Sequence, residues 1–203
     1  MLKPILKGIL FDLVGVLLEF CGPEKISELT RGRVGVDLFS RFWNESEYAL
    51  DFSKGICSPK EFARGAIDYF ELEIGPEEFL ENYQSWYVGP YPGAISLVRE
   101  LKNRFKVGCL SNINEIYTSR FIQELQLNQI MNDCIFSNEV RMVKPDLEIF
   151  YLAARRINLE MGQILFFDDS QTNVDAAIES GMQARRVDGP REVQKVLTEF
   201  GIW

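Results

Sequence analysis

The chain has 203 residues, 46% of them hydrophobic and 26% charged, which is globular composition with enough length for one core domain and a small insertion. A net charge of −8 excludes the basic surface that nucleic acids or anionic membranes require, so we expect a small-molecule partner. The lack of histidine excludes Ser-His-Asp and Cys-His nucleophiles and His-rich zinc sites, leaving carboxylates, hydroxyls and lysine for any chemistry.

The first eleven residues mimic a signal peptide but are followed by Asp12, so we interpret residues 9–11 as a buried strand. No apolar run is long enough to cross a bilayer. The four cysteines lack C-x-x-C pairing, which favours reduced thiols and a cytoplasmic protein. We expect a monomer or a weak homodimer that binds neither nucleic acid nor membrane.

The segment after this strand is too long for a single crossover helix, and it contains only helix-like stretches, such as 58–70 and 76–87. These stretches predict an inserted helical subdomain at residues 17–89, which the resemblance described below identifies as a cap. The cap is then an insertion into a core made of residues 1–16 and 90–203.

The rest of the chain alternates apolar runs with amphipathic segments. Further buried strands are predicted at 107–110, 134–136 and 164–167, with a weaker one at 184–187. Helices are predicted between them at 92–103, 114–127 and 145–157. This alternation predicts the α/β class with a parallel sheet.

Reactive side chains follow three of the predicted strands. Asp12 follows the first, Ser111 and Asn112 end the second, and Asp168 and Asp169 follow the run at 164–167. Ligands bind at the carboxyl edge of parallel sheets, where these residues would meet. Three carboxylates so close together need a cation, and an oxygen-rich site without histidine or thiolate suits Mg²⁺.

Four motifs lie in order along the chain: FDLVGVLL (11–18), LSN (110–112), RMVKPDLEIF (141–150) and FFDDSQTN (166–173). Together they resemble the haloacid dehalogenase superfamily, and specifically its members with a helical cap inserted after the first motif. The resemblance implies a Rossmann-like core. Among these members, the motifs are most similar to those of sugar phosphatases of the glucose 1-phosphate type.

The resemblance implies that Asp12 is the nucleophile and forms an aspartyl phosphate. Ser111 and the backbone around Asn112 would hold the phosphoryl oxygens, with Gly15 also lining the substrate site. Lys144 would bind the phosphoryl group and neutralise the charge that develops on it.

The resemblance also implies a Mg²⁺ site. Asp12 and Asp169 would be its chief carboxylate ligands, Asp168 would support them, and Val14 would contribute its backbone carbonyl.

Val14 departs from the pattern of capped phosphatases, which usually carry a second Asp at this position for acid/base chemistry. General acid/base help contributes roughly 10² to 10⁴ in rate, so slow turnover is expected. Asp51 of the cap is a candidate substitute. Lys54, in the cap turn Lys54-Gly55, is either a substrate contact or part of a plain tight turn.

The resulting hypothesis is a Mg²⁺-dependent phosphatase acting on a small phosphorylated metabolite, a sugar phosphate in the first instance. One alternative is a weakly active or non-catalytic member that binds a phosphorylated ligand or a partner. A second is a 2-haloacid dehalogenase, which also lacks the second Asp. The acidic FFDD motif argues against it, because a metal-free site has no reason to concentrate carboxylates.

Overall fold

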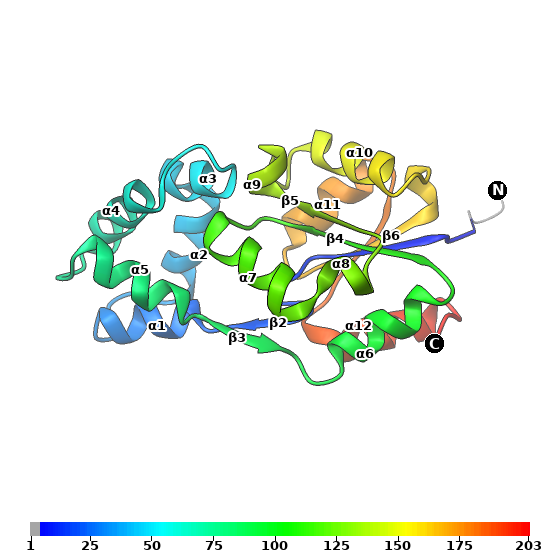
Figure 1. Cartoon of the computed structure of the whole chain (residues 1–203), viewed down its shortest axis with the longest axis horizontal. Helices are drawn as coiled ribbons and strands as arrows, with labels where there is room; N and C mark the ends of the chain where they lie inside the picture. The colour runs from blue at the N-terminus through cyan, green and yellow to red at the C-terminus, as the bar shows by residue number, and fades with distance from the viewer. Residues whose placement is uncertain (1–4) are drawn as a thin grey trace.

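The computed structural model describes residues 5–203 and has a five-stranded, fully parallel sheet. The strand order is β5-β4-β1-β6-β7, which places β1 at the centre. The strands are β1 (Gly8–Phe11), β4 (Lys106–Ser111), β5 (Asp133–Phe136), β6 (Ile164–Asp168) and β7 (Gln183–Arg186). The predicted α/β class with a Rossmann-like core and a helical cap is therefore confirmed, as Figure 1 shows.

Helices cover both faces of the sheet, because its strands are apolar on both sides. On β1, the Ile9 and Phe11 side chains face one helical layer and Leu10 faces the other. The first layer contains α6 (Ala94–Lys102), α7 (Glu115–Leu125), α8 (Leu127–Ile130) and α12 (Gly189–Glu199). The second contains α10 (Leu147–Arg156) and α11 (Gln171–Glu179). Each face is thus a separate apolar cluster.

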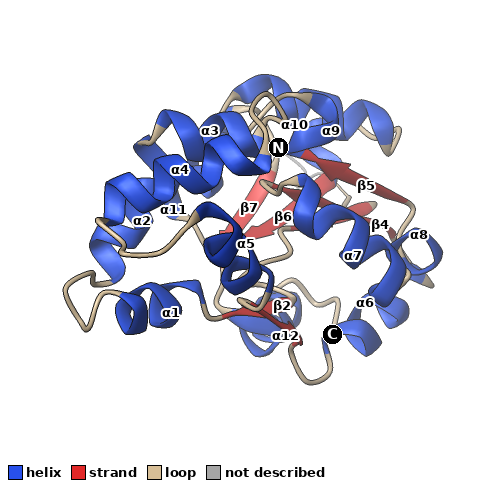
Figure 2. Cartoon of the chain, turned by 60° about the vertical axis from the view of Figure 1, so that its left-hand side comes forward, coloured by secondary structure: helices blue, strands red, loops and turns tan. Residues whose placement is uncertain are grey.

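The five helices that follow β1 and precede Tyr87 form the cap, which lies at the left of Figure 1 and in front in Figure 2. They are α1 (Gly22–Leu29), α2 (Val36–Glu45), α3 (Glu47–Ser53), α4 (Pro59–Phe70) and α5 (Pro76–Gln84). Their interior is aromatic. The Phe62 ring stacks on Phe52 with centroids 4.3 Å apart and contacts Phe79 and Tyr83 as well.

Two short antiparallel strands, β2 (Leu18–Phe20) and β3 (Tyr87–Pro90), connect the cap to the core. The prediction that this segment contains only helices was wrong on this point. The helix expected at 76–87 ends at Gln84, because Tyr87 already pairs with Phe20 in this ribbon. The exact cap limits of 17 and 89 stay a prediction.

Two further predicted helices differ in detail from the sequence expectation. The stretch at 114–127 divides into α7 and α8 because Gln126 adopts a left-handed conformation, with φ of 51°. The helix expected from Pro145 begins at Leu147. Two elements too short to predict are α9 (Ser137–Val140) and the 3₁₀ helix Met161–Gln163.

The four cysteines are free thiols, as the sequence indicated. Among residues 5–203, no helix has the length and apolar character needed to span a membrane.

Candidate active site

The candidate site lies at the carboxyl edge of the three central strands. Asp12 leaves β1, Ser111 ends β4 and Asp168 ends β6, and β1 pairs with both of these neighbours. The Asp12 backbone N–H donates to the Phe167 carbonyl at 2.8 Å, which fixes the start of the loop. Strand order alone therefore brings together residues that are about 155 positions apart in the chain.

Three carboxylates converge at this edge. Asp12, Asp168 and Asp169 each offer an oxygen, and these oxygens all lie within 4.8 Å of one another. Asp12 and Asp168 are buried, whereas Asp169 lies at the exposed rim. Such crowding of like charges is unfavourable unless cations offset it.

Lys144 supplies one such cation. Its side chain is buried, with Nζ 2.6 Å from Asp168 Oδ2 and 3.1 Å from Asp12 Oδ1. Burial acts to lower the pKa of Lys144, but the Asp12 and Asp168 carboxylates outweigh it and raise the pKa, so the side chain is an ammonium. With all three carboxylates ionised, the cluster still carries two uncompensated negative charges.

Burial is the main cause that raises the pKa of Asp12, with the neighbouring Asp168 adding to it and Lys144 opposing it. Burial and then the charges of Asp12 and Asp168 raise the pKa of Asp169 to about 7. Both shifts mean that, without a further cation, the site disfavours the ionised forms of Asp12 and Asp169. A divalent cation would reverse that preference.

Two buried polar atoms at the site have no hydrogen-bond partner within the described residues: Asp12 Oδ1 and Ser111 Oγ. The contact of Asp12 Oδ1 with Lys144 lacks hydrogen-bond geometry. Buried polar atoms are normally satisfied, and leaving one unpaired costs about 1–3 kcal/mol. The Asp12 oxygen has the Lys144 charge beside it, so Ser111 Oγ is the atom that is free to donate to a ligand.

The loop after β1 fits the requirements of a hard cation. The turn's hydrogen bonds go to the carbonyls of Leu13 and Leu18, and within residues 5–203 none of them goes to the Val14 carbonyl. Gly15 has φ of +82°, and a Cβ at this position would meet Asp169 Oδ2 at 2.5 Å. Glycine is thus required for Asp169 to approach. Oxygen donors of this kind suit Mg²⁺.

Asp168 is held by the segment that follows it. Its Oδ1 accepts from the Ser170 backbone N–H at 2.8 Å and from Asn173 Nδ2 at 3.0 Å. With Lys144 on Oδ2, its oxygens are committed to the protein. Asp168 is therefore a support for Lys144 more than a free ligand. Asn173 belongs to the FFDDSQTN motif, but the sequence did not predict that it hydrogen-bonds Asp168. An Asn near the start of a helix is equally consistent with a helix-capping role.

Asn112 lies beside the site with its side chain engaged by the Lys144 backbone. Asn112 Nδ2 donates to the Lys144 carbonyl at 2.9 Å, and Asn112 Oδ1 accepts from the Lys144 N–H at 2.8 Å. The structure therefore places Asn112, Ser111 and Lys144 together.

Lys54 is not joined to this group by any side-chain hydrogen bond or ion pair among residues 5–203. It caps the end of α3, where a Cβ on Gly55 would meet the Asn138 carbonyl at 2.6 Å. Ser137 Oγ, fully buried, donates to the Ser53 carbonyl at 2.6 Å. The turn is therefore a docking point of the cap on the core.

Asp51 lies beside Cys57. Burial first, and then the Asp51 charge, raise the pKa of the Cys57 thiol to about 11.

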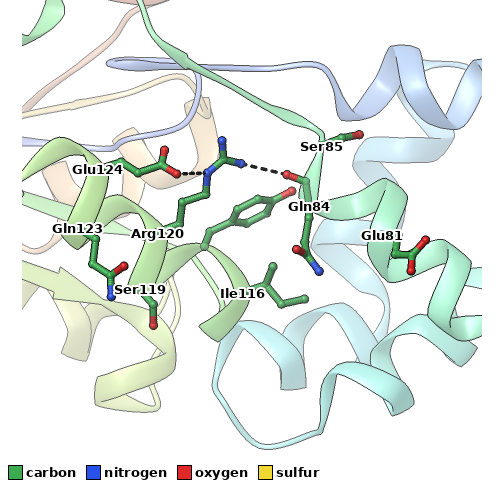
Figure 3. Close-up of a pocket in the computed structure, with 9 residues that line it drawn as sticks. Glu81, Gln84, Ser85, Ile116, Ser119, Arg120, Gln123 and Glu124 are labelled. Atoms are coloured by element: carbon green, nitrogen blue, oxygen red, sulfur yellow. Dashed lines mark hydrogen bonds and ion pairs between the residues drawn. The ribbon is translucent and has the colours of Figure 1, made fainter.

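A cavity of about 540 Å³ lies away from Asp12, Asp168 and Asp169, between α5 of the cap and α7. Figure 3 shows Arg120 of α7 crossing it to the Gln84 carbonyl, at 3.0 Å, and to Glu124, at 2.9 Å. The cavity contains neither the carboxylates nor Lys144. The buried charges lie instead at the carboxylate site, where Asp12, Asp168 and Lys144 meet.

A family model for haloacid dehalogenase-like hydrolases matches residues 6–181. The chain therefore belongs to the haloacid dehalogenase-like hydrolases.

Relatives of more than one activity share this family. The chain is 28% identical, over 87% of its length, to SUPPRESSOR OF QUENCHING 1 of Arabidopsis thaliana, but it spans only 17% of that protein. It is 26% identical to the phosphorylated carbohydrates phosphatase of Thermotoga maritima, covering 88% of this chain and 83% of that protein. It is 22% identical to the (S)-2-haloacid dehalogenase of Pseudomonas putida, covering 98% of this chain and 96% of that protein.

Among solved structures, the chain resembles a HAD family enzyme of Bacteroides thetaiotaomicron in complex with magnesium and inorganic phosphate. The TM-score is 0.72 at 22% identity, covering 89% of this chain and 93% of that one. At this identity the likeness establishes the fold.

Proposed function

We propose that this protein is a Mg²⁺-dependent phosphatase that acts on a small phosphorylated metabolite through an aspartyl phosphate on Asp12. The observation that carries the proposal is the buried Ser111 Oγ, which has no hydrogen-bond partner within the described residues, beside Asp12 and its ion-pair partner Lys144. A nucleophile, a hydroxyl donor and an ammonium are the groups that phosphoryl transfer needs on three sides of phosphorus.

Asp12, Asp169 and the Val14 carbonyl would hold the metal. When bound, Mg²⁺ supplies charge neutralisation for the carboxylates and for the phosphoryl oxygens.

The residues of the chain divide the reaction between them. An Asp12 carboxylate oxygen attacks phosphorus, the bond to the leaving oxygen breaks, and the phosphoryl group is transferred to Asp12. Ser111 Oγ donates to a phosphoryl oxygen, and Lys144 Nζ neutralises charge on another. Water then attacks the phosphorus of the aspartyl phosphate, which releases phosphate and regenerates the Asp12 carboxylate.

Val14 limits both proton transfers. An isopropyl group neither protonates the leaving oxygen nor activates water, so these protons must come from solvent. The loss corresponds to roughly 10² to 10⁴ in rate. We therefore propose that substrates with good leaving groups react best, and that sugar 1-phosphates, including glucose 1-phosphate, are the first metabolites to test. The carbohydrate phosphatase among the relatives supports this substrate class.

A second candidate function is 2-haloacid dehalogenation, which the near-complete coverage of the Pseudomonas putida relative favours. In that reaction Asp12 would attack carbon and displace halide. The three clustered carboxylates weigh against it, because two uncompensated negative charges would remain beside an anionic haloacid.

The test is a release assay with p-nitrophenyl phosphate and a panel of sugar phosphates, in Mg²⁺ and in EDTA, with Asp12→Asn as the control. We expect phosphate release that needs both Mg²⁺ and Asp12. Chloride release from 2-chloropropionate without phosphate release would replace this proposal with the dehalogenase. If neither product forms while inorganic phosphate binds, the protein is a non-catalytic phospho-ligand binder.

A further inference from the structure

We infer that Asn112 is a positioning residue that holds Lys144 in place for the phosphoryl group. The inference rests on the proposed function and deepens it, because it assigns the second polar residue of the LSN segment to Lys144 and not to the substrate. Asn112 follows Ser111 directly, so one dipeptide would organise two of the groups that surround the anion.

The contact is reciprocal. The Asn112 amide accepts from the Lys144 N–H at 2.8 Å and donates to the Lys144 carbonyl at 2.9 Å. Within residues 5–203, these are the only hydrogen bonds of the Lys144 backbone, and the following residue, Pro145, has no N–H to offer. The two positions are 32 apart in the chain, with α7, α8, β5 and α9 between them. The pairing of β5 with β4 ends at Phe136, so among the described residues no strand pairing includes the Lys144 loop.

The Lys144 side chain depends on this anchor. Nζ must reach both Asp168 Oδ2, at 2.6 Å, and Asp12 Oδ1, at 3.1 Å, from a loop outside the sheet. A displacement of a reacting group by about 1 Å can lower the reaction rate about 10²-fold. Asn112 thus acts on the anion through Lys144.

The competing possibility is direct contact. The Asn112 amide nitrogen has a second proton, and Asn112 is exposed, so this proton could reach a bound anion. A double-variant cycle separates the two roles, because groups that act through one another give non-additive effects.

The experiment measures binding of inorganic phosphate in Mg²⁺, and of Mg²⁺ alone, by titration calorimetry. The variants are Asn112→Ala, Lys144→Met and the double variant. Hydrogen bonds to charged groups contribute about 1.5–3 kcal/mol, so we expect Lys144→Met to weaken phosphate binding roughly 10- to 100-fold. Asn112→Ala should weaken it about tenfold, and the double variant should bind no more weakly than Lys144→Met. Mg²⁺ affinity should stay within about twofold in Asn112→Ala, because Asn112 touches none of the carboxylates.

Asn132→Ala is the matched control. Asn132 is also an exposed Asn, and its Oδ1 accepts a backbone N–H at 2.8 Å, from Val107 at the opposite end of β4. It should leave phosphate affinity unchanged. If Lys144→Met does not fold, Lys144→Arg replaces it, since it keeps the charge but changes its position.

Hydrogen exchange of the Lys144 amide tests the anchor without any ligand. This amide should be protected in the wild type and in Asn132→Ala, and should exchange at least about tenfold faster in Asn112→Ala. Unchanged exchange, additive losses of phosphate affinity, or an equal loss of Mg²⁺ affinity would each overturn the positioning role. If wild-type protein binds no phosphate while the amide result holds, the proposed function fails and the anchor stands.

Discussion

The carboxyl edge of the sheet and the interior of the cap are both buried, but they are satisfied to different degrees. In the cap, the Phe62 ring has five aromatic neighbours within packing distance. Within residues 5–203, the buried polar atoms of the cap region without a hydrogen-bond partner are the neutral indole N–H groups of Trp43 and Trp86. At the sheet edge, the Ser111 hydroxyl lacks a hydrogen-bond partner within residues 5–203, and the charged Asp12 Oδ1 meets Lys144 as an ion pair without hydrogen-bond geometry.

This difference indicates that packing determines the structure of the cap interior, whereas the sheet edge is arranged for ligand binding. The cap interior is held together by its aromatic pairs, and its unpaired groups are two uncharged indole N–H donors. The sheet edge carries charge that disfavours the metal-free fold, which is typical of functional sites. Substitutions at the sheet edge should therefore reduce catalysis while the stability of the metal-free protein rises or stays unchanged. Substitutions in the cap interior should lower stability and leave Mg²⁺ affinity unchanged.

The largest effect is expected for Asp12→Asn. Removing the nucleophile from other covalent hydrolases costs roughly 10⁶ in kcat, and phosphate release should fall to a similar extent. The metal-free protein should become more stable, because one of three crowded carboxylates loses its charge. Steady-state assays and thermal unfolding in EDTA measure both, with the exposed Asp175→Asn as control. A loss of stability would break the comparison.

The cap counterpart is Phe62→Ala. Phe62 is fully buried, and truncating such a ring typically costs about 3–5 kcal/mol. Urea unfolding should show this loss, while the Mg²⁺ affinity of the folded variant should equal that of the wild type. Tyr69→Ala, on the same helix but partly exposed, should cost much less. Equal costs at the two positions would mean that the cap is not organised by this aromatic interior.

Val14→Asp sharpens the chemical half of the comparison. A carboxylate here should restore proton transfer, and breakdown of phosphorylated Asp12 should accelerate about 10²-fold, the lower end of the range for acid/base catalysis. Acid quench of the radiolabelled phosphoenzyme measures its lifetime, with Val14→Asn as the uncharged control. An unchanged lifetime would mean that another group, such as Asp51, already transfers the proton.

The smallest effect is a pH dependence of the response to Mg²⁺. The pKa of Asp169 is raised to about 7, so the folded state retains a proton that the unfolded chain has already released. Stability of the metal-free protein therefore falls as pH rises from about 4 through about 7. Bound Mg²⁺ cancels this loss, so the Tm gain from Mg²⁺ should be larger at pH 8 than at pH 5.5.

Because Asp169 is exposed at the rim, we expect solvent screening to limit this difference to about 1 kcal/mol, or roughly 2–4 °C in a chain of this size. Asp169→Asn should abolish it. A Tm gain that is the same at both pH values in the wild type would contradict the raised pKa.

The sequence by itself determined the class of fold and the composition of the sheet edge. Apolar runs that end in Asp12, Ser111 and Asp168 are local signals, and the geometry of a parallel sheet converts them into one site. The replacement of the second Asp by Val14 could also be recognised from the sequence, because this position lies two residues after Asp12.

Only the tertiary structure decided how these groups are held. Asn112 and Lys144 are 32 positions apart and join through side-chain-to-backbone bonds that no periodicity encodes. The ribbon of β2 and β3 likewise pairs strands about 70 residues apart, so Tyr87 reads locally as the end of a helix. Local pattern specifies which residues reach the edge of the sheet, whereas long-range contacts specify which atoms are left free there.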